Sequence, residues 1–244
     1  MSDFQRTQWS DVSRAGYFMD HSSRYIPYRE QTQALLASLL CCVIAPRFPG
    51  NPLGVLELGC GDGALSQALL LRCPDIRLTL LDGSPEMLEG ARKRFGPDPK
   101  VHYIQATFQD VIAGRVDLGD PHIVVSAFAI HHLTLAEKGQ LFACAARALV
   151  SGGVFANVDV VLSPAACLEE WYLELWRDWI REHDRVAADG KSFVHIPTQY
   201  KGNTDNLPDT LDEQLRELKQ AGFQPVDVFY KCGLFAVYGG FKPQ

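Results

Sequence analysis

Short apolar runs alternate with segments of helical spacing through the middle of the chain. The apolar runs predict five strands, at 53–58, 76–81, 101–105, 123–128 and 154–161. Between them, apolar positions that recur every three to four residues predict helices over 64–72, 85–95 and 135–149. Continuous apolar strands that alternate with helices are typical of a parallel sheet covered on both faces. The pattern therefore predicts an α/β fold.

Residues that favour helix ends agree with these boundaries. Ser84 before Pro85 supplies an N-cap followed by a proline at the first helical position. Thr134 and Glu137 have the spacing of a capping box. The glycine pair at 152–153 follows the third of these helices and is expected to end it.

The two ends of the chain have a different pattern. Residues 1–33 are polar and aromatic, with a helix expected to start near Arg29. Residues 163–189 predict a long helix rich in tryptophan and acidic residues, and residues 190–208 predict a loop. The last segments predict a helix at 209–221 and two strands at 225–230 and 234–241. Because only a few residues separate these two strands, they are expected to form an antiparallel hairpin.

Three glycines follow the first predicted strand in the segment VLELGCGDG. Gly59, Gly61 and Gly63 let a ligand approach the backbone closely, beside the N-terminus of the next helix. Their spacing differs from the G-x-G-x-x-G of dinucleotide sites, which argues against a nicotinamide dehydrogenase. Glu57, at the end of the strand, suits an ammonium group or ordered water and has no evident use beside a phosphate.

An acidic residue ends the second predicted strand. Asp82 follows Gly63 by 19 residues. A carboxylate at this place in an α/β sheet is suited to binding both ribose hydroxyls of an adenosine. The glycine turn and Asp82 together predict a site for an adenosine-containing ligand.

Length and charge narrow the classes of function. The 244 residues predict one domain, or one domain with a cap. The net charge is −6, so a broad electrostatic attraction to nucleic acid or anionic lipid is not expected, whereas a local basic patch stays open. The most apolar stretch, 34–45, is shorter than the roughly 20 residues that span a bilayer. With no signal peptide visible at the N-terminus, we expect a cytoplasmic protein without membrane association.

The seven cysteines form no C-x-x-C pair. An odd number of cysteines in a chain of this kind predicts reduced thiols. Cys41, Cys144 and Cys232 are expected in the core, because a free cysteine packs as a small apolar side chain. No metal site is expected.

Four motifs in order resemble those of a known enzyme family. They are VLELGCGDG, LLDGSPEML, IVVSAFAIHHL and LVSGGVFANVD, within roughly residues 30–160. Together they are similar to the class I S-adenosylmethionine-dependent methyltransferases. The resemblance implies a Rossmann-like, seven-stranded, mostly parallel sheet with a reversed last strand, helices on both faces and a helical cap insertion. Residues 25–28 and 230–240 also resemble the bacterial branch that modifies the wobble uridine of tRNA by carboxymethyl transfer.

The resemblance implies S-adenosyl-L-methionine as the cofactor and places it along the glycine turn. Its methionine part would follow Gly59, Cys60 and Gly61, and its ammonium group would lie near Glu57. Its ribose would be held by Asp82.

The remaining cofactor contacts come from other loops. The family has an acid after the third strand, whereas this chain reads QATF, so Thr107 or Phe108 would contact the adenine there. The other implied contacts are Gly83 and Met87 beside the adenine, Ser126 and Ala127 beside the sulfonium, and Tyr28, together with Arg24 or Tyr17, closing over the cofactor.

Two adjacent histidines follow the fourth predicted strand, whose carboxyl end faces the ligand crevice of an open α/β sheet. Methyl transfer to a hydroxyl or acidic N–H group needs an aligned nucleophile and a base that titrates near neutral pH. His131 is the predicted base, ahead of His132. In the alternative interpretation, both histidines cap the next helix and have no chemical role.

The predicted long helix carries an aromatic face. Tyr172, Leu175, Trp176 and Trp179 share that face by their spacing. They line a substrate pocket in one interpretation and form core or a dimer face in the other. We therefore expect a single domain over 1–244, with an N-terminal closing segment at 1–33 and a cap or lid insertion at 163–208.

Three functions stay open. The first is methyl transfer from S-adenosylmethionine to an O, N or S nucleophile of a small molecule, which the net charge of −6 and the cap-sized insertion favour. The second is tRNA modification on the same fold, with plain or carboxylated cofactor. The third is a non-catalytic cofactor-binding partner. The acceptor itself does not follow from the fold, and the oligomeric state, a homodimer included, stays open.

Overall fold

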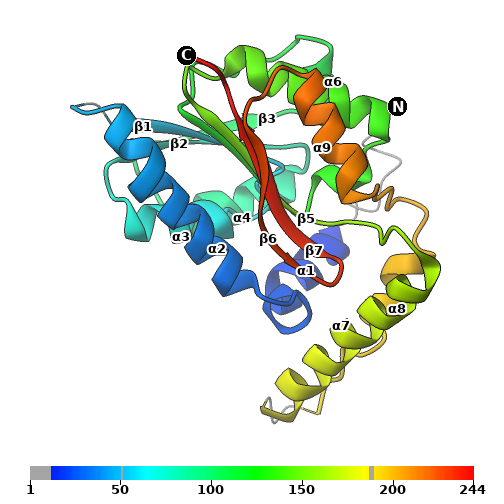
Figure 1. The fold of residues 1–244 in the computed structure, drawn as a ribbon. Coiled ribbons are helices and arrows are strands. Elements are labelled where there is room, and N and C mark those ends of the chain that lie inside the picture. The colour runs from blue at the N-terminus through cyan, green and yellow to red at the C-terminus, as the bar shows by residue number, and fades with distance from the viewer. Residues whose placement is uncertain (1–11, 51, 187–189) are drawn as a thin grey trace.

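The computed structural model describes residues 12–50, 52–186 and 190–244 and contains a seven-stranded sheet (Figure 1). The strand order is β3-β2-β1-β4-β5-β7-β6. β1 to β5 pair in parallel, whereas β7 runs antiparallel to both β5 and β6. This confirms the predicted fold class and the reversed last strand. The strands are β1 (Leu53–Leu58), β2 (Ile76–Asp82), β3 (Val101–Gln105), β4 (Ile123–Ala127), β5 (Val154–Val160), β6 (Val226–Cys232) and β7 (Phe235–Phe241).

Helices connect the strands and cover both faces of the sheet (Figure 1). The α-helices are α1 (Val12–Tyr25), α2 (Arg29–Ser38), α3 (Ala64–Arg72), α4 (Pro85–Phe95), α5 (Phe108–Ile112), α6 (Leu135–Ala148), α7 (Ala166–Val186), α8 (Ile196–Gly202) and α9 (Leu211–Gln220). A π-helix η3 (Leu39–Ile44) and a 3-10 helix η4 (Ala45–Arg47) extend α2, and a 3-10 turn η5 (Ile130–His132) follows β4.

The predicted helix boundaries are confirmed where side chains specify them. The Ser84 Oγ accepts a hydrogen bond from the Met87 N–H group at the start of α4. Thr134 and Glu137 form the reciprocal bonds of a capping box at the start of α6.

Successive residues along the strands point into two separate cores. One core lies beneath α2, η3, α3 and α4 and includes Leu40, Leu69, Leu88, Val55 and Val125. The other lies beneath α5, α6 and α9 and includes Val111, Phe142, Leu218, Leu56 and Val124. The strands are thus apolar on both faces because both faces are covered, as the continuous apolar runs in the sequence predict.

α7 and α8 project beyond the C-terminal end of β5 (Figure 1). They share a third core with β7 and with the end of α1, built around Trp176, Ile180, Phe193, Phe235 and Tyr25. The Trp176 Nε1–H donates to the Tyr25 carbonyl at 2.7 Å, which fastens α7 to the N-terminal segment.

The prediction of a loop over 190–208 is wrong for residues 196–202, which form α8. Pro197 lies in the first turn of α8, where a proline needs no N–H partner, and it is buried. This short helix is held by tertiary packing, which local sequence signals do not report.

The prediction that all cysteines are reduced is wrong for two of them. Cys41 in η3 and Cys73 after α3 form a disulfide across a sequence separation of 32 residues. Cys144 is buried as predicted, whereas Cys41 and Cys232 are only partly buried. The pair forms because the α2–η3 segment packs along α3, a long-range contact that cysteine spacing does not reveal.

We expect the Cys41–Cys73 disulfide to stabilise the fold measurably. Closing a loop of 32 residues removes chain entropy worth roughly 3–4 kcal/mol from the unfolded state. The double substitution Cys41→Ser with Cys73→Ser should lower the free energy of unfolding by about that amount in a urea titration, whereas Cys42→Ser, on the exposed neighbour, should not. Seven titratable thiols in the unreduced, denatured protein would contradict the disulfide, since five are expected.

None of the helices in the described part of the chain is long and apolar enough to cross a membrane.

Candidate functional site

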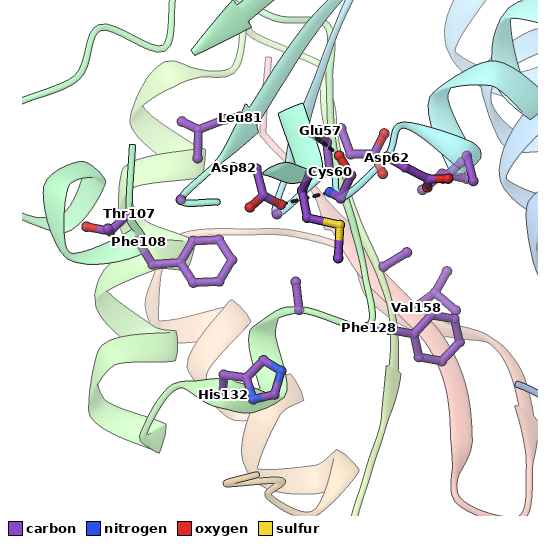
Figure 2. Close-up of a pocket in the computed structure, with 18 of the residues that line it drawn as sticks. Glu57, Cys60, Asp62, Leu81, Asp82, Thr107, Phe108, Phe128, His132 and Val158 are labelled. Atoms are coloured by element: carbon purple, nitrogen blue, oxygen red, sulfur yellow. Dashed lines mark hydrogen bonds between the residues drawn. The ribbon is translucent and has the colours of Figure 1, made fainter. Parts of the chain in front are cut away.

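A cavity of about 280 Å³ lies at the C-terminal ends of β1, β2 and β4 (Figure 2). Open parallel sheets bind their ligands at this edge. Its wall combines α2, the glycine turn, the loops after β2 and β4, and the start of α5. The sequence-predicted site residues that line it are Glu57, Gly59, Cys60, Gly61, Asp82, Gly83, Met87, Thr107, Phe108 and Ala127.

The glycine turn has a backbone that other residues rarely adopt. Gly59, Gly61 and Gly63 all have positive φ angles, of 67°, 54° and 76°. A Cβ atom on Gly59 would lie 2.5 Å from the Cβ of Ala129. At Gly61 the nearest side-chain atom lies 3.8 Å away, so this position borders open cavity. The glycines therefore serve both the turn and a close approach of ligand to backbone.

Asp82 links the two loops at this edge of the sheet. Its Oδ2 accepts the Gly61 N–H and its Oδ1 accepts the Ser84 N–H, both at 2.8 Å. Burial raises the pKa of this carboxyl, and the backbone N–H groups that it accepts oppose that rise. The side chain lines the cavity, so the same group that fixes the glycine turn is presented to a ligand.

Glu57 is an almost fully buried carboxyl group, 2% exposed, on the cavity wall. Its Oε2 accepts the Ser66 hydroxyl and the Ser66 N–H in the first turn of α3. Burial raises the pKa of Glu57 to about 8, although the two bonds from Ser66 lower it. Without a ligand, Glu57 is thus largely protonated at neutral pH, and a cationic ligand group would favour its ionised form.

This protonation predicts a pH dependence of ligand binding. If the cofactor ammonium contacts Glu57, binding at pH 7 releases a proton, and affinity rises as the pH approaches 8. The same raised pKa makes the ligand-free protein lose stability as the pH rises from about 4.5 to about 8, because the folded state binds the proton more tightly.

Calorimetry of S-adenosylhomocysteine binding at pH 7, in two buffers with different ionisation enthalpies, measures the proton release directly. The wild type should show different apparent enthalpies in the two buffers. Glu57→Gln, which cannot ionise, should show equal ones. Equal enthalpies for the wild type would mean that Glu57 does not meet the ammonium group.

α2 contributes a cation that sequence reasoning missed. Arg29 lines the cavity together with Thr32 and Gln33. Its Nη1 donates to the Ser22 Oγ at 2.8 Å, and burial lowers its pKa while the nearby Asp62 carboxylate opposes that change. A guanidinium stays charged in either case. The expected start of a helix near Arg29 was the only sequence signal, and it gave no direction for the side chain.

Thr107 and Phe108 line the cavity at the start of α5. The acid that follows them, Asp110, forms a capping box with Thr107, which holds its pKa down at about 2. The nearest carboxylate of this loop is therefore engaged in capping α5.

Two predicted contacts do not line the cavity. Ser126 is buried, and its Oγ donates to the Leu58 carbonyl at 2.7 Å. Tyr28 precedes α2, and its ring packs against Trp179 and Tyr230, with centroids 6.3 and 6.0 Å away. Their roles at the cofactor stay predictions.

The two histidines of η5 have different surroundings. His131 is 7% exposed, and its Nδ1 lies 2.6 Å from the Oδ1 of Asp159, a residue that is 1% exposed. Burial raises the pKa of Asp159, but its interactions with His131, the Val160 N–H and Lys138 together lower it below its usual value. His132, in contrast, lines the cavity, and its ring lies across from Glu57 and Asp82 (Figure 2).

The aromatic face of α7 is divided between core and surface. Trp176 is buried, Trp179 stacks on His183 with ring centroids 3.6 Å apart, and Leu175 and Trp171 are exposed. None of these side chains lines the cavity. In the described part of the chain, no three His, Cys, Asp or Glu side chains converge as metal ligands.

The cavity suits a nucleoside joined to an amino acid. Arg29 provides a cation for a carboxylate, Glu57 a carboxylate for an ammonium group and Asp82 a carboxylate for a ribose diol, all on one cavity wall. The open position at Gly61 leaves room beside the backbone. Burial raises the pKa of the Cys60 thiol, so Cys60 contributes a neutral surface to this wall.

Comparisons with known proteins agree with the cavity chemistry. Residues 55–153 match the model of a methyltransferase domain. The chain is 29% identical to the carboxy-S-adenosyl-L-methionine synthase of Chromohalobacter salexigens, over 92% of this chain and 80% of that protein.

Two solved structures share the fold. An O-methyltransferase family protein from Burkholderia thailandensis superposes with a TM-score of 0.69 and 15% identity, covering 98% of this chain and 63% of that one. Human N-acetylserotonin methyltransferase in complex with SAM superposes with a TM-score of 0.55 and 16% identity, covering 97% of this chain and 66% of that one. The chain thus spans about two thirds of these larger proteins.

Proposed function

The chain contains a class I S-adenosylmethionine-dependent methyltransferase domain, and on this premise we propose that it transfers the methyl group to an O, N or S atom of a small molecule. The observation that carries the proposal is the order of groups along the cavity. Arg29 and Glu57 offer the charges that an amino-acid group needs, and Asp82 offers a carboxylate for a ribose diol. His132 lies across the cavity from Glu57 and Asp82 (Figure 2).

The cofactor supplies an activated methyl group on a sulfonium, and the protein supplies position and proton transfer. Arg29, Glu57 and Asp82 would hold the two ends of the cofactor. A histidine of the pair 131–132 would take the proton from the acceptor. The tertiary packing of α7 and α8 against β7 and α1 would limit access of water to the acceptor side.

The direct test is transfer of a labelled methyl group from S-adenosylmethionine to a panel of phenols, aliphatic alcohols, amines and thiols, with unmodified tRNA tested in parallel. Methylation of a small molecule, with no label on the tRNA, supports the proposal. Label on the tRNA alone would contradict it and favour the tRNA-modifying alternative, which the net charge of −6 does not favour.

A second candidate function is synthesis of a carboxylated cofactor. It is favoured by the similarity to the carboxy-S-adenosyl-L-methionine synthase of Chromohalobacter salexigens, which extends over 92% of this chain. A carboxylate on the transferred carbon would call for a cation near the sulfur. The described cavity wall has one guanidinium, that of Arg29. The charges of Glu57 and Asp62 act on it, so it lies at the end of the cavity assigned to the amino-acid group. The cavity therefore favours the plain cofactor.

Mass spectrometry of the ligand that co-purifies with the protein separates these two functions. S-adenosylmethionine or S-adenosylhomocysteine is expected. A carboxylated adduct would overturn the first proposal and establish the second. Purification of Arg29→Gln in parallel is the matched control, since it should retain less of either ligand.

A further inference from the structure

Among the titratable side chains on the described cavity wall, His132 is the one that comes from the segment after β4. The other titratable groups on the described wall are Arg29, Glu57, Cys60, Asp62 and Asp82, and all of these lie on α2, β1, the glycine turn or β2. The other residues that the segment after β4 adds to the wall, Phe128, Ala129 and Leu133, are apolar. His132 thus brings acid–base chemistry to the end of the cavity that faces the cap.

The hydrogen bond of one ring nitrogen defines the tautomer of His132. Its Nδ1 lies 2.9 Å from the Asp205 backbone oxygen. A carbonyl oxygen only accepts hydrogen bonds, so Nδ1 carries the proton of the neutral ring. The basic lone pair is then on Nε2, the nitrogen on the other side of the ring.

The Asp205 carbonyl that orients His132 belongs to a loop held by several hydrogen bonds. The Asp205 N–H donates to the Asn203 Oδ1 at 3.0 Å, and the Asn206 Nδ2 donates to the Tyr200 carbonyl at 2.9 Å. The Leu207 N–H donates to the His131 carbonyl at 2.7 Å, which ties the same loop to η5. The loop between α8 and α9 therefore holds the imidazole of His132 in one orientation.

His131 has the surroundings of a supporting residue. Besides the contact at Nδ1, its own backbone N–H donates to the Asp159 Oδ2 at 3.0 Å. The Asp159 Oδ1 also accepts the Val160 N–H at 2.9 Å. Asp159 thus fastens η5 to β5, and the ring of His131 packs against that of His132 with centroids 4.1 Å apart.

We propose that His132 is the general base of the methyl transfer and that His131, held by Asp159, is a positioning residue. This inference rests on the proposed function and assigns a role within the same site. The acceptor O–H, N–H or S–H proton passes to His132 Nε2. The acceptor atom keeps the electron pair with which it bonds the methyl carbon, and the pair of the broken carbon–sulfur bond stays on sulfur.

A pair of acceptors tests this division of roles. Phenol is protonated at neutral pH and needs a base, whereas thiophenol is largely ionised there and does not. His132→Asn retains an amide N–H that can still bond the Asp205 carbonyl but has no basic nitrogen. It should slow methylation of phenol by about 10²–10⁴-fold and that of thiophenol only a few-fold. His131→Asn, the comparison variant, should slow both acceptors equally, because it disturbs position.

NMR titration provides a readout without turnover. S-adenosylmethionine carries a positive charge on sulfur, and S-adenosylhomocysteine does not. If His132 lies near the sulfur, the midpoint of its titration should be lower by about 0.5–2 in the first complex than in the second. His122 is the internal control, because it precedes β4 and its Nδ1 accepts the Gly54 N–H at the other end of the strand.

The proposal is overturned by equal titration midpoints of His132 in the two complexes, or by an equal loss of rate with phenol and thiophenol in His132→Asn. Failure of the proposed function would look different. In that case the wild type would transfer label to tRNA alone, or would co-purify with a carboxylated adduct, whatever the titration midpoints of His132.

Discussion

Asp82→Ala is expected to weaken S-adenosylhomocysteine binding by about 3 kcal/mol, or roughly 100-fold, in calorimetry. The substitution removes the carboxylate that would bind the ribose diol. It also leaves the N–H groups of Gly61 and Ser84 without the acceptor that now lies 2.8 Å from each. Both effects act on the same cavity, so the loss of affinity should exceed that of an ordinary surface hydrogen bond.

Asp98→Ala is the matched control for this prediction. The Asp98 Oδ1 accepts the N–H of the residue two positions later, Lys100, at 2.8 Å, as the Asp82 Oδ1 does with Ser84. Asp98 does not line the cavity. Its removal should leave affinity unchanged within about twofold. Equal affinities for the wild type and Asp82→Ala would show that Asp82 does not bind the ligand.

Gly59→Ala should be strongly destabilising. The new Cβ would lie 2.5 Å from the Ala129 Cβ and 3.0 Å from the Phe108 Cζ, on a backbone with a φ of 67°. Overpacking and left-handed strain together cost about 2–4 kcal/mol. Calorimetric unfolding should show a fall in Tm of roughly 10 °C, with loss of cofactor binding.

Two further variants separate the causes of this effect. Gly61→Ala has a similar φ of 54° but no close neighbour, so it should cost only about 1 kcal/mol. Adding Ala129→Gly to Gly59→Ala removes the atom that clashes and should recover part of the stability. Equal stabilities of Gly59→Ala and Gly61→Ala would show that the contact with Ala129 does not limit this position.

Local sequence signals predicted the sheet and the glycine-turn wall of the cavity. Each parallel strand is a continuous apolar run because both faces are covered, and Ser84, Thr134 and Glu137 set helix starts through bonds within a few residues. The positive φ angles at Gly59, Gly61 and Gly63 demand glycine, so the turn is visible in the sequence itself.

Features that depend on contacts between distant segments could not be predicted in this way. Arg29 reaches the cavity only because α2 packs beside α3, and the same packing joins Cys41 to Cys73. The difference between His131 and His132 depends on Asp159 and on the Asp205 carbonyl, which are 28 and 73 residues away along the chain. No spacing rule reports such distances.

We propose that this cavity holds S-adenosylmethionine with its amino-acid end at α2 and its sulfur toward His132. A crystal structure of the complex with S-adenosylhomocysteine tests it most directly. We expect the carboxylate at Arg29, the ammonium at Glu57, the ribose hydroxyls on Asp82 and the sulfur on the side of Phe128 and His132. Density for the ligand elsewhere, or in the reverse orientation, would contradict it.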